Sequence, residues 1–227
     1  MIFVRNLLFY FIFYFWSALF FSILFPVKFF SRNFTFIISE FWTFTVVKLS
    51  EWILGIAYSV KGEENIPESQ FILASKHQSA WETFFLPVLF TNSIFVLKKE
   101  LDKIPILRGY FKKLGYIFVD KNSSHSSMRK LLTSAKNSIK TGIKTIMIFP
   151  EGTRVKINEK KDLNSGVYAL YRSLNLPVLP ITHNSGEFWI NKKIIKKSGK
   201  INVTIFPPIN PGLPKEDFMK KLTEFIR

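Results

Sequence analysis

The N-terminal part of the chain contains 22 consecutive residues without a charged side chain, between Arg5 and Lys28. At about 1.5 Å of rise per residue, about 20 apolar residues match a hydrocarbon core of about 30 Å, so this stretch predicts a helix that binds or crosses a membrane. A cleaved signal peptide is the alternative, but its apolar region is usually shorter. No small-residue cleavage site follows either, because Phe25, Pro26 and Val27 come next. We therefore expect the segment to be kept and to hold the protein at a membrane.

A second apolar stretch, residues 33–60, is interrupted by charges and has helical periodicity. We expect an amphipathic helix in the headgroup region, with Trp42 and Trp52 as interfacial anchors. The alternative is a core helix of the domain that follows. The two stretches divide the chain into an N-terminal two-helix membrane segment, residues 1–60, and a second domain, residues 61–227. In the second stretch, residues 33–60, the residues that recur at helical spacing are Phe41, Phe44, Val47, Lys48 and Glu51.

The aromatic and the charged side chains lie in different parts of the chain. Residues 1–60 hold 14 of the 26 Phe with four basic and two acidic residues, whereas residues 61–227 hold 28 basic and 14 acidic residues. The net charge of the whole chain, +16, indicates an anionic partner, either nucleic acid or an anionic membrane surface. The absence of cysteine excludes disulfides, zinc–thiolate sites, iron–sulfur clusters and cysteine nucleophiles.

Residues 61–227 alternate short apolar runs with polar stretches of helical periodicity. This alternation predicts an α/β fold, with a mixed, largely parallel sheet flanked by helices. Ligands of such sheets gather at the carboxyl ends of the strands. The expected strands are Gln70–Ser75, Ser93–Leu97, Tyr116–Val119, Thr145–Phe149, Pro177–Thr182 and Asn202–Phe206. The expected helices are Thr83–Phe90, Ile106–Leu114, Ser126–Thr141, Leu163–Leu174 and Lys215–Ile226.

His77 follows the first of these strands, and Glu82 comes five positions later. A carboxylate on one imidazole nitrogen fixes the tautomer and leaves the other nitrogen free to take a proton. On a regular helix the two side chains would lie about 140° apart, so they meet only if His77 lies in the turn before the helix that Glu82 enters. By itself the spacing is weak and is more typical of a loop histidine with an incidental acid in a first helical turn.

A second polar constellation follows the expected strand Thr145–Phe149, in the run Pro150-Glu151-Gly152-Thr153-Arg154. Gly152 permits a tight turn and close approach of a ligand to the backbone. Arg154 offers a planar fork of donors suited to a phosphate, and Glu151 is placed to orient Arg154 or a substrate hydroxyl. Since both constellations follow strands, we expect them to share one site at the carboxyl edge of the sheet.

The two motifs, in this order, resemble those of the glycerolipid acyltransferases, in particular the 1-acylglycerol-3-phosphate acyltransferases. Further segments are similar to that family's lead-in turn, middle motif and late proline motif, so that the resemblance covers roughly residues 58–210. The chain departs from the family pattern at Glu82, where the family usually has an aspartate, and at Lys121, where it usually has an arginine. Those further segments are residues 61–67, 98–109 and 178–181.

The resemblance implies a reaction and a set of partners. His77 would take the proton from the free hydroxyl of a lysophosphatidate, and Glu82 would hold the imidazole. Arg154 and Gly152, with Lys121, would bind the phosphate of the acceptor, with Glu151 and Thr153 in the same binding loop. The acyl donor would be acyl-CoA or acyl-carrier protein, and no metal or other cofactor is implied. The expected location is the bacterial inner membrane, with the catalytic domain facing the cytoplasm.

Three alternatives remain at this point: an acyltransferase for another lyso-lipid such as lyso-ornithine lipid, a catalytically silent lipid-binding relative, and a membrane-tethered nucleic-acid-binding protein. No nucleic-acid-binding module is recognisable, so no nucleic-acid partner is expected. His125, in a serine-rich loop, and His183, without an acid at the motif spacing, are left out of the expected catalytic set.

Overall fold

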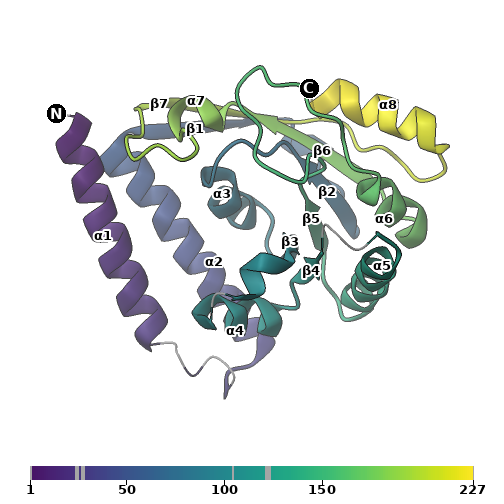
Figure 1. The fold of residues 1–227 in the computed structure, drawn as a ribbon, viewed down its shortest axis with the longest axis horizontal. Helices are drawn as coiled ribbons and strands as arrows, with labels where there is room; N and C mark the ends of the chain where they lie inside the picture. The colour runs from purple at the N-terminus through teal and green to yellow at the C-terminus, as the bar shows by residue number, and fades with distance from the viewer. Residues whose placement is uncertain (1, 24–25, 27–28, 104, 121–123, 227) are drawn as a thin grey trace.

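The computed structural model describes residues 2–23, 26, 29–103, 105–120 and 124–226. Within these residues a seven-stranded sheet, in the order β1-β7-β6-β2-β5-β3-β4, lies between two groups of helices (Figure 1). The strands are β1 (Ile56–Lys61), β2 (Phe71–Ser75), β3 (Ser93–Lys98), β4 (Ile117–Val119), β5 (Thr145–Ile148), β6 (Val178–His183) and β7 (Gly199–Ile205). The α-helices are α1 (Ile2–Ile23), α2 (Arg32–Leu49), α3 (Trp81–Leu89), α4 (Pro105–Leu114), α5 (Ser124–Lys140), α6 (Gly166–Leu174), α7 (Ser185–Phe188) and α8 (Lys215–Ile226).

Five neighbouring strands, from β6 through β2, β5 and β3 to β4, run parallel to one another, and β7 is antiparallel to β6. β1 is parallel to β7 at the other edge. The expected mixed, largely parallel α/β sheet is confirmed. The central strands β2 and β5 are buried along their whole length, which suits their nearly continuous apolar sequence, because helices cover both faces of a parallel sheet.

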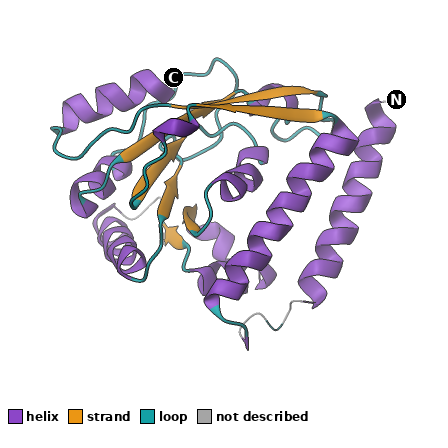
Figure 2. Cartoon of the chain, turned by 180° about the vertical axis from the view of Figure 1, so that it is seen from behind, coloured by secondary structure: helices purple, strands orange, loops and turns teal. Residues whose placement is uncertain are grey.

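Helices lie on both faces of the sheet (Figure 2), and each face carries its own hydrophobic core. One core joins the sheet to α1, α2 and α3 through side chains such as Phe9, Val47 and Phe85. The other joins it to α5, α6 and α8 through Leu131, Leu170 and Phe218. The six expected strands and the five expected helices of residues 61–227 are all present, with ends shifted by a few residues.

The two N-terminal helices differ in how far they pack on the sheet domain. α1 is long and apolar enough to cross a membrane, and only Asn6, Phe9 and Phe20 of its described residues are buried. α2 packs against α3 and buries Val46 and Val47. Its other face exposes Ile37, Phe41 and Phe44. α2 is therefore amphipathic, as expected, but its buried face belongs to the protein core.

Two expectations about the second helix are wrong. The helix does not continue to Val60: a π-helical turn, Ser50–Leu54, ends at Gly55, whose φ of 69° lies in the left-handed region. A Cβ atom there would also lie 2.7 Å from the guanidinium of Arg5. The following residues form β1, so the sheet begins before the division expected at residue 60.

Trp42 is the second correction, because its ring packs between helices instead of marking the membrane interface. The centroids of the Phe21 and Phe84 rings lie 5.3 and 5.6 Å from that of Trp42. Trp52, the other expected anchor, is 74% exposed. Of the two expected anchors, Trp52 is thus exposed, whereas Trp42 is half-buried.

Candidate active site

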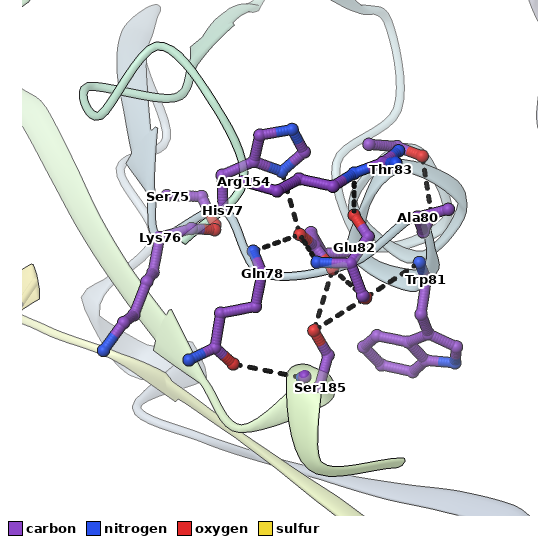
Figure 3. Close-up of polar contacts among 12 residues, drawn as sticks. Ser75, Lys76, His77, Gln78, Ala80, Trp81, Glu82, Thr83, Arg154 and Ser185 are labelled. Atoms are coloured by element: carbon purple, nitrogen blue, oxygen red, sulfur yellow. Dashed lines mark hydrogen bonds and ion pairs between the residues drawn. The ribbon is translucent and has the colours of Figure 1, made fainter. Parts of the chain in front are cut away.

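Three neighbouring parallel strands bring the polar residues of the site to one edge of the sheet. β2 ends before His77, β5 ends before the loop of residues 149–154, and β6 ends at His183. Since β2 lies between β5 and β6, the segments that follow these strands meet although they are far apart in the sequence. Figure 3 shows His77, Glu82, Arg154 and Ser185 converging there. The structure thus brings the two motifs together.

His77 lies in the turn before α3, and Glu82 lies in the first turn of that helix. His77 Nδ1 is 2.9 Å from Glu82 Oε1. The His77 ring stacks on Phe149 with the centroids 4.0 Å apart, which fixes its plane. The pair therefore satisfies the geometric condition set by its five-residue spacing. With Nδ1 on the carboxylate, Nε2 is the nitrogen left for a substrate proton.

Glu82 is completely buried and is surrounded by hydrogen-bond donors. The backbone N–H groups of Gln78 and Ser79 each donate to Oε1 at 2.7 Å. The hydroxyls of Ser79 and Ser185 donate to Oε2. Burial alone would raise the pKa of Glu82, but the imidazoles of His183 and His77 and the Ser79 hydroxyl outweigh burial and lower the pKa to about 2. Glu82 is therefore a carboxylate over the whole physiological pH range.

Glu151 is also buried, at 3% exposure, but it has few partners. Its Oε1 accepts a long hydrogen bond, 3.4 Å, from the backbone N–H of His77. Its Oε2 has no hydrogen-bond partner among the described residues. Burial raises the pKa of Glu151 to about 7 against the opposing effects of backbone N–H groups and Lys76. Glu151 contacts the turn that carries His77, and no hydrogen bond joins it to Arg154 within the described residues.

Gly152 gives the loop after β5 its shape. Its φ of 65° is left-handed, and a Cβ atom would lie 2.7 Å from Asn164 Nδ2. Its N–H donates to the Phe149 carbonyl at 2.9 Å, so it is not available to a ligand in this conformation. Thr153 is half-buried beside it. Gly152 therefore forms a tight turn, as expected.

Arg154 carries the exposed positive charge of the site. Its Nε donates to the Ser79 carbonyl at 3.1 Å, and its Nη1 donates to Asn191 Oδ1 at 3.2 Å. These two contacts hold the guanidinium beside the His77 turn, and Figure 3 shows both side chains on the same side of Glu82. Lys121, the other expected phosphate ligand, lies outside the described residues. His125 is in the first turn of α5, and its side chain is also outside the described part of the structure.

Sequence reasoning missed three residues that support the site: His183, Ser185 and Asn191. His183 is buried and its Nε2 donates to the Lys76 carbonyl at 2.9 Å, while burial lowers the pKa of its imidazole. Ser185 contacts Glu82, and Asn191 contacts Arg154. The one available signal was that His183 and Ser185 follow an expected strand. In the part of the chain that the structure describes, no three His, Asp or Glu side chains are close enough to hold a metal ion.

This fold and site define an acyltransferase. The family model described as Acyltransferase matches residues 57–184, more than half of the chain, and the chain belongs to this family. The 1-acyl-sn-glycerol-3-phosphate acyltransferase of Pseudomonas aeruginosa is 35% identical over 195 residues, which are 86% of this chain and 75% of the relative. The protein of the same name from Borreliella burgdorferi is 28% identical over 184 residues, 80% of this chain and 73% of the relative.

A solved structure has the same fold. The crystal structure of the 1-acyl-sn-glycerophosphate (LPA) acyltransferase from Thermotoga maritima aligns with a TM-score of 0.80 at 23% sequence identity. The alignment covers 100% of this chain and 95% of that chain, so it includes the two N-terminal helices. The family model and the relative from P. aeruginosa confirm the family resemblance seen in the sequence, and the solved structure shows the same fold.

Proposed function

We propose that this acyltransferase moves a fatty acyl group from a thioester to the free hydroxyl of 1-acylglycerol-3-phosphate and produces phosphatidate for phospholipid biosynthesis. The observation that carries the proposal is the His77–Glu82 pair, with Nδ1 and Oε1 2.9 Å apart, beside the exposed guanidinium of Arg154. A base next to a phosphate-binding cation suits an acceptor that has both a hydroxyl and a phosphate. The names of the relatives from P. aeruginosa and B. burgdorferi agree with this acceptor.

In the proposed reaction, His77 Nε2 takes the proton of the acceptor hydroxyl as its oxygen attacks the thioester carbonyl. Glu82 keeps Nδ1 protonated and stabilises the imidazolium that forms. When the tetrahedral intermediate collapses, the C–S bond breaks and the imidazolium returns its proton to the leaving thiolate. The products are phosphatidate and a free thiol. General-base catalysis of this kind contributes roughly 10²–10⁴-fold to the rate.

The phosphate of the acceptor is assigned to Arg154, whose guanidinium offers a bidentate fork. Gly152 and Thr153 shape the loop that presents it, and Lys121 stays a candidate for a second contact. Glu151, from the same loop, accepts a hydrogen bond from the backbone N–H of His77. Substrate binding by these residues is part of the proposal.

The acyl donor is proposed to be acyl-CoA or acyl-carrier protein, both of which are acidic and complement a domain with 28 basic and 14 acidic residues. No metal or other cofactor takes part in the proposed steps. We place the protein at the bacterial inner membrane with the catalytic domain on the cytoplasmic side, because the donors are cytoplasmic and α1 is a candidate membrane helix.

The test is an acyl-transfer assay of the purified full chain with lysophosphatidate, using acyl-CoA and acyl-carrier protein in parallel. We expect phosphatidate formation, and we expect His77→Ala to lower kcat by roughly 10²–10⁴-fold. His125→Ala, at a histidine left out of the expected catalytic set, is the matched control. Lyso-ornithine lipid, which lacks the phosphate, should react poorly. Near-normal turnover by the His77 variant would contradict the assignment of the base.

A further inference from the structure

The loop between α7 and β7, residues 189–198, exposes two isoleucines among lysines. Ile194 and Ile195 are 73% and 40% exposed, although they are large and apolar. The neighbouring side chains Lys192, Lys193 and Lys197 are exposed as well. Apolar side chains interleaved with lysines match an anionic bilayer surface, where the apolar groups enter the acyl boundary and the ammonium groups meet lipid phosphates.

This loop is fastened to the N-terminal half of α1. Asn6 Nδ2 donates to the Lys196 carbonyl at 3.0 Å, and the Lys196 N–H donates to Asn6 Oδ1 at 2.7 Å. The hydroxyl of Tyr10 donates to the Ile194 carbonyl at 2.9 Å. Figure 1 shows the loop beside the upper part of α1. These hydrogen bonds explain why a polar residue, Asn6, occurs in an apolar helix: its side chain binds the backbone of the loop.

The contact with α1 makes the loop continuous with a larger apolar surface. Leu7 and Phe11, which flank Tyr10 on the helix, are 62% and 68% exposed. Phe3, one helical turn before Leu7, is 63% exposed. Since the α1 helix is the candidate membrane element of the chain, the isoleucines of the loop extend the same membrane-facing surface.

The loop holds its shape through Lys196, which points inward while its neighbours point outward. Lys196 is 5% exposed, and its Nζ donates to the carbonyls of Ile190 and Lys193 at 2.9 and 2.6 Å. The ammonium also lies 5.4 Å from the centroid of the Trp189 ring. The hydrogen bonds of Lys196 therefore stabilise the loop conformation that exposes Ile194 and Ile195.

The same loop contacts the proposed phosphate ligand, since Asn191 Oδ1 accepts a hydrogen bond from Arg154 Nη1 at 3.2 Å. We propose that residues 189–198 dock on an anionic lipid bilayer, with Ile194 and Ile195 inserted and the exposed lysines on the lipid phosphates, and that this docking sets Arg154 at headgroup level. The role of Arg154 rests on the proposed function, whereas the docking of the loop does not.

Depth-dependent quenching tests the docking directly. Because the chain has no cysteine, Ile195→Cys gives a single labelling site for an environment-sensitive fluorophore. Lys221→Cys, on the exposed face of α8, is the matched control, because α8 and α1 lie at opposite ends of the molecule in Figures 1 and 2. We expect spin-labelled lipid to quench the fluorophore at position 195 and not at 221, in vesicles of phosphatidylethanolamine and phosphatidylglycerol.

Charge reversal tests the lysines and the coupling to the site. Lys192→Glu with Lys193→Glu should lower the acyl-transfer rate on vesicle-presented lysophosphatidate about tenfold, and high salt should lower the wild-type rate in the same direction. The rate on monodisperse short-chain lysophosphatidate should stay unchanged. Lys220→Glu with Lys221→Glu, an equal charge change on α8, should leave both rates unchanged.

Equal quenching at positions 195 and 221, or equal vesicle rates for the two charge-reversed pairs, would overturn the proposal. Failure of the wild-type protein to acylate lysophosphatidate in either form would instead contradict the proposed function. The quenching result would then still decide whether the loop docks, because quenching requires no turnover.

Discussion

The turns that follow β2 and β5 are neighbours, and each buries a carboxylate, but the two carboxylates have opposite environments. Glu82 accepts hydrogen bonds from two backbone N–H groups and two serine hydroxyls. Against desolvation, the imidazoles of His183 and His77 and the Ser79 hydroxyl lower its pKa to about 2. Glu151 accepts one long hydrogen bond, and burial raises its pKa to about 7. Similar burial thus gives opposite shifts, because the imidazoles of His183 and His77 and the Ser79 hydroxyl outweigh desolvation at Glu82, whereas desolvation dominates at Glu151.

This difference separates two tasks. The β2 turn is saturated with internal hydrogen bonds, which holds the His77 ring in one tautomer and one orientation before any substrate arrives. The β5 turn keeps an exposed guanidinium at Arg154 and a carboxyl oxygen at Glu151 that has no hydrogen-bond partner among the residues the structure describes. We therefore expect substitutions in the β2 turn to affect kcat and stability, and substitutions in the β5 turn to affect substrate binding.

The largest effect is expected for Glu82→Gln. This change removes the negative charge and places an NH₂ donor group among the N–H and O–H donors that surround Glu82. The depression of the pKa of Glu82 from 4.5 to about 2 corresponds to about 3 kcal/mol, since a tenfold change is about 1.4 kcal/mol. At pH 8 the variant should lose on the order of 3 kcal/mol of unfolding free energy in urea titrations, and kcat should fall strongly.

The stabilisation that Glu82 contributes to the fold should depend on pH. Because the pKa of Glu82 is lower in the fold than in the unfolded chain, its stabilisation is present above pH 4.5 and disappears as the pH falls toward 2. The difference between the wild type and the variant should shrink over that range. Glu216→Gln, an exposed acid on α8, is the control. Equal stabilities at pH 8 would show that Glu82 is not the strongly stabilised carboxylate described.

Arg154→Ala tests the β5 turn. A hydrogen bond to a charged group contributes about 1.5–3 kcal/mol, so KM for the phosphate-bearing acceptor should rise roughly 10- to 100-fold. kcat should change much less, because the base is untouched, and Arg154→Lys should fall between. Steady-state kinetics with varied acceptor at saturating donor measures the split. An unchanged KM would place the phosphate elsewhere.

Glu151→Gln should have the opposite sign to Glu82→Gln. Because burial raises the pKa of Glu151 to about 7, its contribution to stability is lost as the pH rises from 4.5 through 7. Glutamine avoids that ionisation and should raise the unfolding free energy at pH 8 by about 1–2 kcal/mol, with little change near pH 4.5. Thermal melts at both pH values measure the effect. Destabilisation at pH 8 would erase the contrast between the two carboxylates.

Ser185→Ala removes one of the hydroxyls on Glu82 and leaves the remaining donors in place. We expect a loss of about 1 kcal/mol in unfolding free energy and a small decrease in kcat, with no change in KM. Ser134→Ala, on the exposed face of α5, should change none of these. A large loss of kcat would assign Ser185 a greater part in positioning Glu82 than its 2.8 Å hydrogen bond to the carboxylate indicates.

Much of the fold was predictable from local pattern. The six expected strands are short apolar runs, and the five helices of the same region have helical periodicity, both of which are properties of neighbouring residues. β1 was missed because apolar residues run from Trp52 to Tyr58, across the end of the helix, and only Gly55 marks the change from helix to strand. Trp42 was misplaced because its neighbours, Phe21 and Phe84, come from other helices.

The α/β class, the apolar N-terminal helix and the two motifs can be read from the amino-acid sequence, because each depends on spacing or composition within a short segment. The folded chain was needed to show that the ends of β2, β5 and β6 are neighbours, since strand order is set by packing between distant segments; Glu82 and Ser185, for example, are more than 100 residues apart. It also decided the protonation of Glu82 and Glu151, because burial and donor number are properties of the assembled site. For the same reason, Asn6 and Asn191 became meaningful only when α1, the α7–β7 loop and Arg154 were seen side by side.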